Sequence, residues 1–204
     1  MSAAASAYRL GVYGGAFDPP HLAHRALIEI ALSQLKLDSL HVVPTGQAWH
    51  KPRSLSAATH RLAMCELAFS DLDKVHLDDR ETRRNSASFT VDTLRELRQE
   101  NGQAELFLII GADQAQAFQT WKSWPEILDL AKVCVAQRPI NGSLPTAPVV
   151  PQALAVRLHE LKMPALDISA SDIRLRRASG QSLQGLVCEP VAGYIDKHHL
   201  YQSL

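Results

Sequence analysis

The feature that most constrains this chain is the alternation of short apolar runs with segments whose apolar residues recur at helical spacing. The apolar runs predict strands at Tyr8–Gly14, Leu40–Pro44, Val75–Leu77, Leu106–Ile110 and Val133–Ala136. The helical patterns lie at His21–Lys36, Thr59–Phe69, Thr90–Asn101, Ser171–Ala178 and Val191–His198. Together they predict an α/β fold: a Rossmann-like, doubly wound parallel sheet with flanking helices and a small C-terminal helical segment. Ligands of such sheets bind beyond the carboxyl ends of the strands, where the strand order reverses.

Length and charge narrow the classes of function. With 204 residues we expect a single domain over 1–204, of which about 168–204 is the C-terminal helical part. The formal net charge is zero, so no overall field favours a nucleic acid or a membrane as partner. Cys65, Cys134 and Cys188 are scattered, which argues against a disulfide framework. The chain shows neither a signal-peptide pattern nor an apolar run of membrane-spanning length, so we expect a cytoplasmic protein.

The first candidate site follows the first predicted strand. Gly14 and Gly15 stand at the strand end, and His21 and His24 stand three residues apart in the first turn of the next helix. Glycines let the backbone approach a ligand, and a helix N-terminus offers free N–H groups to an anion. This pattern predicts a phosphate site. Two other roles stay open: capping or packing by one histidine, or a metal pair, although no third metal ligand is evident nearby.

Asp18 precedes Pro19, which keeps it out of helical geometry. Its carboxylate is expected to brace the turn, and contact with a ligand hydroxyl or ammonium is the alternative.

Two further segments repeat the pattern of a polar residue at a helix start. In Gly111–Asp113, the carboxylate of Asp113 could accept hydrogen bonds from ribose hydroxyls or cap its helix. In the segment from Ser169 to Arg174, two hydroxyls and a cation at one helix end suit a polyphosphate. The alternative there is that Ser171 is a plain N-cap and Arg174 is solvated. Arg176 and Arg177 are expected to face water.

The remaining candidates are an aromatic residue, a helix start and a loop cation. Trp121 could stack on a heteroaromatic ring or belong to the core, as could Trp124. Thr90 could present backbone N–H groups to an anion or cap its helix. Lys51 lies in the loop 45–56 and is either a phosphate ligand or simply solvated. The proline-rich stretch 139–151 is expected to be an extended surface connection.

Five strings of this sequence resemble, in order, motifs of the bacterial nicotinate-nucleotide adenylyltransferase family of the nucleotidyltransferase superfamily. The opening resembles GGxFDPxHxGH, Ser88–Leu94 resembles SYTxDTL, Gly111–Trp121 resembles GxDxxxxxxxW, Ile168–Arg174 resembles ISSTxIR, and Tyr194–Tyr201 resembles YIxxxxLY. The departures are Ala16 for Thr or Ser, Ala23 for Gly, Phe89 for Tyr, and Ala170 and Ser171 for Ser and Thr. No departure removes a histidine, so we expect catalysis to survive.

The resemblance implies a reaction in which ATP and nicotinate mononucleotide give deamido-NAD and pyrophosphate in NAD biosynthesis. The attacking 5′-phosphate has a second pKa of about 6, so it needs no strong general base. The implied catalytic residues are His21, His24 and Arg174. The implied ATP-binding residues are Gly14, Gly15, Phe17, Asp18, Gly111, Asp113, Ser169 and Ser171. The implied acceptor-binding residues are Lys51, Ser88, Thr90 and Trp121. Mg²⁺ is expected to be held through the ATP phosphates and water, without metal ligands from the protein.

Other functions compete with this one. An adenylyltransferase for nicotinamide mononucleotide differs only in the substrate's carboxamide, and the residues alone do not decide between the two acceptors. A phosphopantetheine enzyme is disfavoured because such enzymes are typically shorter and lack a segment like Ser88–Leu94. A non-catalytic nucleotide sensor would keep the glycines but could lose a histidine or Arg174. A tRNA synthetase fragment would need a lysine-serine loop and a basic surface. The oligomeric state, the role of 139–151 and the effect of Ala16 and Ala23 stay open.

Overall fold

A computed structural model describes residues 7–46, 55–137 and 157–202. Its centre is a six-stranded sheet in the order β3-β2-β1-β4-β5-β6, and every neighbouring pair is parallel. The strands are β1 (Arg9–Gly15), β2 (Ser39–Pro44), β3 (Val75–Leu77), β4 (Glu105–Gly111), β5 (Lys132–Gln137) and β6 (Leu158–Lys162). The strand order reverses between β1 and β4, which confirms the doubly wound parallel sheet.

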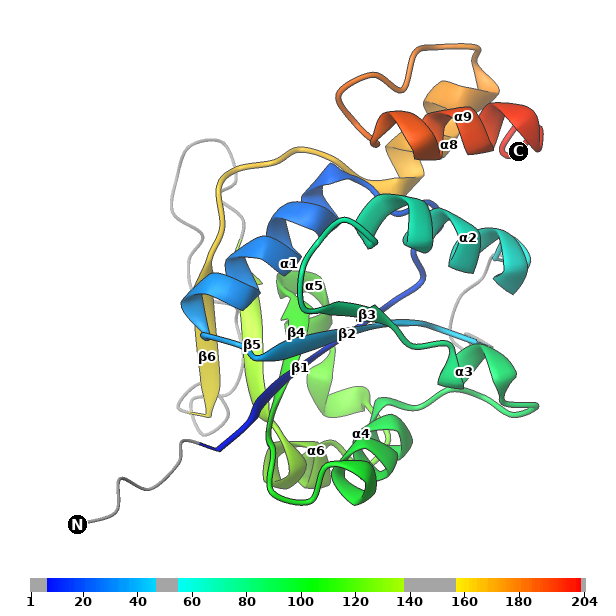
Figure 1. Ribbon diagram of the computed structural model, residues 1–204. Coiled ribbons are helices and arrows are strands. Elements are labelled where there is room, and N and C mark those ends of the chain that lie inside the picture. The colour runs from blue at the N-terminus through cyan, green and yellow to red at the C-terminus, as the bar shows by residue number, and fades with distance from the viewer. Residues whose placement is uncertain (1–6, 47–54, 138–156, 203–204) are drawn as a thin grey trace.

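Helices cover both faces of this sheet. The helices are α1 (Leu22–Gln34), α2 (Ala58–Phe69), α3 (Arg80–Arg83), α4 (Thr90–Glu100), α5 (Ala112–Gln116), the 3₁₀ turn η1 (Phe118–Thr120), α6 (Trp124–Leu130), α8 (Ala170–Ala178) and α9 (Glu189–Lys197). In Figure 1, α1, α2, α8 and α9 lie above the sheet, whereas α4 and α6 lie below it. Among the described residues, no helix combines the length and the apolar character needed to span a bilayer.

The core consists of one apolar layer on each face of the sheet. In β4, Phe107 and Ile109 pack with α1 and α2, whereas Leu106, Leu108 and Ile110 pack with α4 and α6. Because both faces of a parallel strand are buried, such a strand is apolar at every position and does not alternate. This is why the continuous apolar runs of the sequence located β1, β2, β4 and β5.

The C-terminal helices share the upper layer. Ile173 of α8 and Val191 and Ile195 of α9 are fully buried in the same cluster as residues of α1 and α2. The helical segment predicted near the C-terminus is therefore present, and it packs on the same face of the sheet as α1 and α2.

Two parts of the sequence interpretation need correction. The edge strand β6 was not predicted, because its sequence Leu-His-Glu-Leu-Lys exposes most of its side chains and lacks an apolar run. The short elements α3, η1 and α6 were also missed, since three to seven residues show no helical periodicity. Lys51 and the proline-rich stretch 139–151 lie outside the described residues.

Candidate functional site

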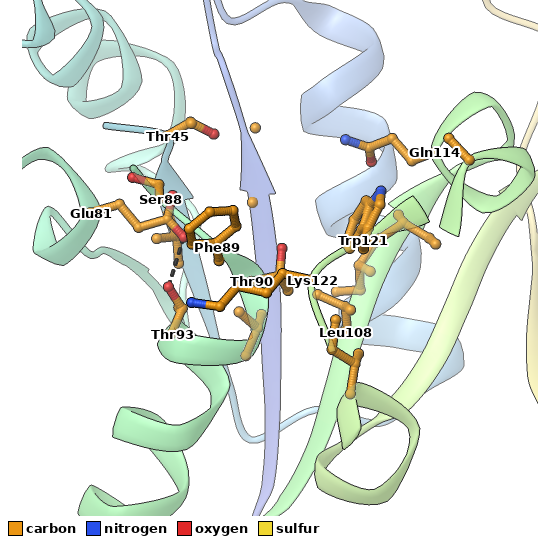
Figure 2. A pocket seen from close by; sticks show the side chains of 18 of the residues that line it. Thr45, Glu81, Ser88, Phe89, Thr90, Thr93, Leu108, Gln114, Trp121 and Lys122 are labelled. Atoms are coloured by element: carbon orange, nitrogen blue, oxygen red, sulfur yellow. Dashed lines mark hydrogen bonds between the residues drawn. The ribbon is translucent and has the colours of Figure 1, made fainter. Parts of the chain in front are cut away.

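A cavity of about 330 Å³ opens at the carboxyl ends of β1 and β4, where the strand order reverses. Of the residues singled out in the sequence, the cavity brings together Gly14, Gly15, Ser88, Thr90, Asp113 and Trp121. Figure 2 shows Trp121 and Gln114 on one side of it, facing Thr45, Glu81 and Ser88 on the other. The cavity therefore lies where a doubly wound sheet binds nucleotides.

The glycine turn at the end of β1 forms one wall. A side chain at Gly15 would place its Cβ 3.1 Å from the ring of Phe17, so the buried ring would have to shift to admit it. Phe17 itself has a positive φ of 47° and is buried, with its ring 5.0 Å from that of His24. The Phe17 side chain thus packs against the His24 ring, so that any contact of Phe17 with ATP would come from its backbone.

The two histidines form a stacked pair at the start of α1. His21 occupies the N-cap position in an extended conformation, and its backbone N–H donates to Nδ1 of His24 over 3.2 Å. Their ring centroids are 3.6 Å apart and the ring planes differ by 17°. Because Nδ1 of His24 accepts a hydrogen bond, the neutral ring carries its proton on Nε2, which makes that nitrogen a donor. The pair lies at the other end of the turn that starts at Gly15, and neither histidine is among the residues that line the cavity.

Asp18 braces the turn between Gly15 and His21. Its buried carboxylate accepts a hydrogen bond from the Tyr201 hydroxyl (2.6 Å) and one from the backbone N–H of Ser56 (3.2 Å). Burial, together with the charge of Asp18, raises the pKa of Tyr201, so the hydroxyl stays protonated and can donate. The bracing role predicted for Asp18 is confirmed, and a contact between Asp18 and ATP stays a prediction.

Arg61 is a second brace, which the sequence interpretation missed. It is 2 % exposed and donates to the backbone carbonyls of Ala16 (2.9 Å) and Ser56 (3.0 Å). Burial lowers its pKa, an effect that the charge of Asp18 opposes. A recognisable signal existed, because Arg61 lies at helical spacing from Met64, Cys65 and Ala68 on the buried face of α2.

The start of α8 differs from the N-cap alternative considered for Ser171. Ser169 is the N-cap, and its Oγ accepts from the backbone N–H of Asp172 over 3.1 Å. Ser171 lies inside the helix and accepts from Nη2 of Arg174 over 3.1 Å. The other terminal nitrogen of Arg174 donates to the backbone carbonyl of Asp18 over 2.7 Å. Arg174 is therefore not simply solvated, because it ties α8 to the histidine turn.

The next two arginines of α8 differ in their exposure to solvent. Arg176 is exposed and pairs with Asp172 over 2.8 Å, as expected for a surface residue. Arg177 is half-buried and pairs with Asp196 of α9 over 3.0 Å, so the expectation that it faces water was wrong.

The wall opposite Trp121 is built by α3 and the start of α4. Ser88 accepts a hydrogen bond from the backbone N–H of Gly46 over 3.2 Å. Phe89, and not Thr90, occupies the N-cap position of α4, so the alternative of a capping role for Thr90 was wrong. Trp121 is half-buried and packs on Phe118 with ring centroids 5.5 Å apart, which leaves part of its surface in the cavity. Trp124 also packs on Phe118.

Two charged residues of the cavity were not anticipated. Glu81 is buried, accepts a hydrogen bond from the Thr93 hydroxyl over 2.7 Å, and has a pKa raised by its burial. Lys122 lies with its Nζ 4.3 Å from the centroid of the Phe89 ring. Glu81 falls in a four-residue helix without a motif, and Lys122 had only its place beside Trp121 as a signal.

A helix begins at the end of β4, as predicted, but its N-cap is not Asp113. Gly111 is the N-cap of α5, and its backbone N–H donates to Oε1 of Gln114 over 3.3 Å. Asp113 is exposed in the first turn of α5 and lines the cavity, so its carboxylate is accessible to a ligand hydroxyl. In the part of the chain that the structure describes, no three His, Cys, Asp or Glu side chains converge to hold a metal ion.

Comparisons with known proteins agree with this geometry. Residues 12–176 match the cytidylyltransferase-like family. A probable nicotinate-nucleotide adenylyltransferase of Albidiferax ferrireducens is 53% identical over 195 residues, which are 96% of this chain and 98% of that protein. A protein of the same name from Methylibium petroleiphilum is 41% identical over 95% of this chain and 92% of its own length. The solved structure of Plasmodium falciparum nicotinic acid mononucleotide adenylyltransferase complexed with NaAD superimposes with a TM-score of 0.78. The superposition covers 96% of this chain and 98% of that one at 18% identity, which shows a common fold.

Proposed function

Because this chain belongs to the nicotinate-nucleotide adenylyltransferase family, we propose how its cavity performs the reaction of that family. The protein is a nucleotidyltransferase of NAD biosynthesis that joins ATP and nicotinate mononucleotide to give deamido-NAD and pyrophosphate. The observation that carries the proposal is the junction of two features. A stacked imidazole pair stands at the start of the helix that follows Gly15, and the cavity lined by Gly14 and Gly15 carries Trp121 on another wall.

In the proposed reaction an oxygen of the acceptor's 5′-phosphate attacks the α-phosphorus of ATP. One P–O bond forms there, the bond to the β-phosphate bridging oxygen breaks, and pyrophosphate leaves. The attacking phosphate is already ionised near neutral pH, since its second pKa is about 6. The protein therefore has to position two anions and stabilise their charge, and it does not need a nucleophile of its own.

The ATP phosphates are assigned to the end of the cavity near α1 and α8. The Nε2–H of His24 and the ring of His21 would donate toward phosphate oxygens, aided by the N-terminus of α1. Arg174 has five N–H donors, so it can keep its bonds to Asp18 and Ser171 and still reach a leaving pyrophosphate. Ser169 and Ser171 would contact the same phosphates.

The adenosine part and the acceptor are assigned to the cavity itself. Gly14 and Gly15 allow close backbone approach, and Gly111 with Asp113 lies beside them for the adenosine hydroxyls. Ser88, Thr90 and Trp121 would receive nicotinate mononucleotide, with its pyridine ring stacked on the indole. Lys51 remains assigned to the substrate phosphates.

Magnesium fits this site as part of the nucleotide substrate. The side chains next to the assigned phosphates are imidazoles, hydroxyls and a guanidinium, which suit phosphate oxygens better than a bare Mg²⁺ ion. The carboxylates beside them already have partners, since Asp18 accepts from Tyr201 and Ser56 and Asp172 pairs with Arg176. We therefore assign Mg²⁺ to the complex with ATP, and a cytoplasmic location belongs to the same proposal.

Steady-state assays test this function. The purified protein is incubated with MgATP and, separately, with nicotinate mononucleotide, nicotinamide mononucleotide or phosphopantetheine. We expect deamido-NAD and pyrophosphate in equal amounts and the highest kcat/KM with nicotinate mononucleotide. Binding of ATP without turnover of any acceptor would instead identify a nucleotide sensor. A higher kcat/KM with nicotinamide mononucleotide would assign the enzyme to the other pyridine acceptor.

A further inference from the structure

We propose that the side chain of Lys122 selects the acidic acceptor, because its ammonium binds the carboxylate of nicotinate mononucleotide. The inference deepens the function proposed above and rests on it. The two pyridine acceptors differ in one substituent, a carboxylate against a neutral carboxamide. A positive group near that substituent would favour the acidic acceptor.

Lys122 is placed to supply that group. It follows Trp121 directly, and both residues line the cavity. Its side chain crosses toward the opposite wall, where Nζ lies 4.3 Å from the centroid of the Phe89 ring. Figure 2 shows Lys122 next to Thr90 in the space between the Trp121 side and the α4 side. A pyridine ring stacked on Trp121 could therefore point its substituent across the cavity toward the ammonium.

The charges around the cavity single out Lys122. Among the described residues that line it, Lys122 is the one cation, and the acidic residues are Glu81 and Asp113. Glu81 is buried and turned to Thr93, and Asp113 lies on α5 beside Gly111. A substrate carboxylate placed near either acid would be repelled, whereas beside Lys122 it would meet an ammonium whose partner Asp92 is also neutralised by Arg95.

A network of ion pairs holds the lysine in place. Nζ lies 3.3 Å from Oδ2 of Asp92, whose Oδ1 accepts a hydrogen bond from Arg95 over 2.7 Å. Arg95 in turn forms two hydrogen bonds to Glu126, at 2.6 and 2.7 Å. Asp92 is therefore shared between two cations. The ammonium has three N–H donors and its side chain is 47% exposed, so it can keep Asp92 and bind a second carboxylate.

The test compares both acceptors in a variant without the charge. Lys122→Met keeps an unbranched apolar stem against Phe89 and removes the ammonium. We expect kcat/KM for nicotinate mononucleotide to fall about tenfold, the size of one partly exposed charge-assisted hydrogen bond. The value for nicotinamide mononucleotide should change by less than about twofold, because its amide loses no ionic partner. The preference of the unaltered protein should also weaken as salt is raised, and that of the variant should not.

Controls separate the possible outcomes. Lys122→Arg should keep most of the preference, and Lys197→Met, an exposed position on α9, should change neither acceptor. Equal losses for both acceptors would show that Lys122 only supports the cavity. Unchanged kcat/KM values for both acceptors in Lys122→Met would show that other groups bind the carboxylate, for example backbone N–H groups at the start of α4. Either result overturns the assignment of Lys122 and leaves the proposed function standing, whereas turnover of neither acceptor by the unaltered protein overturns both.

Discussion

At the scale of single residues, the histidine pair shows how one backbone contact determines a proton position. The N–H of His21 occupies Nδ1 of His24, so the donor of the neutral ring is Nε2. His24→Ala removes that donor, and we expect kcat to fall on the order of 10²–10³, as for the loss of one charge-stabilising group. The measurement is kcat with both substrates saturating.

The matching control is His159→Ala, an exposed histidine on the edge strand β6, which should leave kcat unchanged. Thermal unfolding of the two variants should differ little, because the His24 ring is only half-buried. A His24→Ala protein with near-normal turnover would remove this residue from the mechanism.

At the scale of elements, the C-terminal segment holds the turn that carries the histidines. Arg174 of α8 bonds the carbonyl of Asp18, and Tyr201, just after α9, bonds its carboxylate over 2.6 Å. Tyr201→Phe removes one buried charge-assisted hydrogen bond and leaves Asp18 with one partner fewer. We expect a loss of about 1.5–3 kcal/mol in the free energy of unfolding. We also expect a lower kcat, because the turn gains freedom.

Urea unfolding and steady-state kinetics measure the two effects. Tyr8→Phe is the matched control, since Tyr8 is 50% exposed and lies before β1. If Tyr201→Phe matched this control in both stability and kcat, the hydrogen bond from Tyr201 to Asp18 would contribute neither to stability nor to catalysis.

At the scale of the whole molecule, two buried carboxylates make stability depend on pH with opposite signs. Burial alone would raise the pKa of Asp78, but hydrogen bonds from His41 and Arg80 outweigh it and lower this pKa to about 2. Since the unfolded value is near 4, Asp78 stabilises the fold above pH ~4, and about 2 kcal/mol of this is lost as the pH falls toward 2. Urea unfolding between pH 2 and 6 measures this effect. The difference in free energy of unfolding between the unaltered protein and Asp78→Asn should be smaller at pH 2 than at pH 6.

Glu81 provides the opposite comparison. Its pKa is raised by burial, so the folded protein holds this proton more tightly than the unfolded chain does. Stability from this group is present below the unfolded pKa of about 4.3 and decreases as the pH rises above it. Glu81→Gln keeps an acceptor for the Thr93 hydroxyl. Its free energy of unfolding should therefore increase relative to that of the unaltered protein as the pH rises. If the free energy of unfolding of each variant ran parallel to that of the unaltered protein over this pH range, both assignments would be contradicted.

The order of strands and helices could be predicted from local pattern because that pattern has a local cause. A parallel strand covered on both faces is apolar throughout, and a helix that packs on a sheet has apolar residues at helical spacing. The elements β1, β4, α1 and α4 can therefore be recognised in the sequence. The glycine turn and the two histidines were recognisable for the same reason, since all of them lie within eleven consecutive residues. The edge strand β6 was not, because its pairing with β5 leaves most of its side chains in solvent.

The sequence alone thus determined the class of sheet, the glycine–histidine turn and the family to which the chain belongs. Folding in three dimensions decided which distant residues meet. Asp18 joins Tyr201, 183 positions away; Arg61 reaches the carbonyl of Ala16; and Lys122 comes to lie over Phe89. The physical reason is that a side chain's partner across the fold depends on packing angles and on the crossing of helices over the sheet. Neither quantity leaves a periodic trace along the sequence.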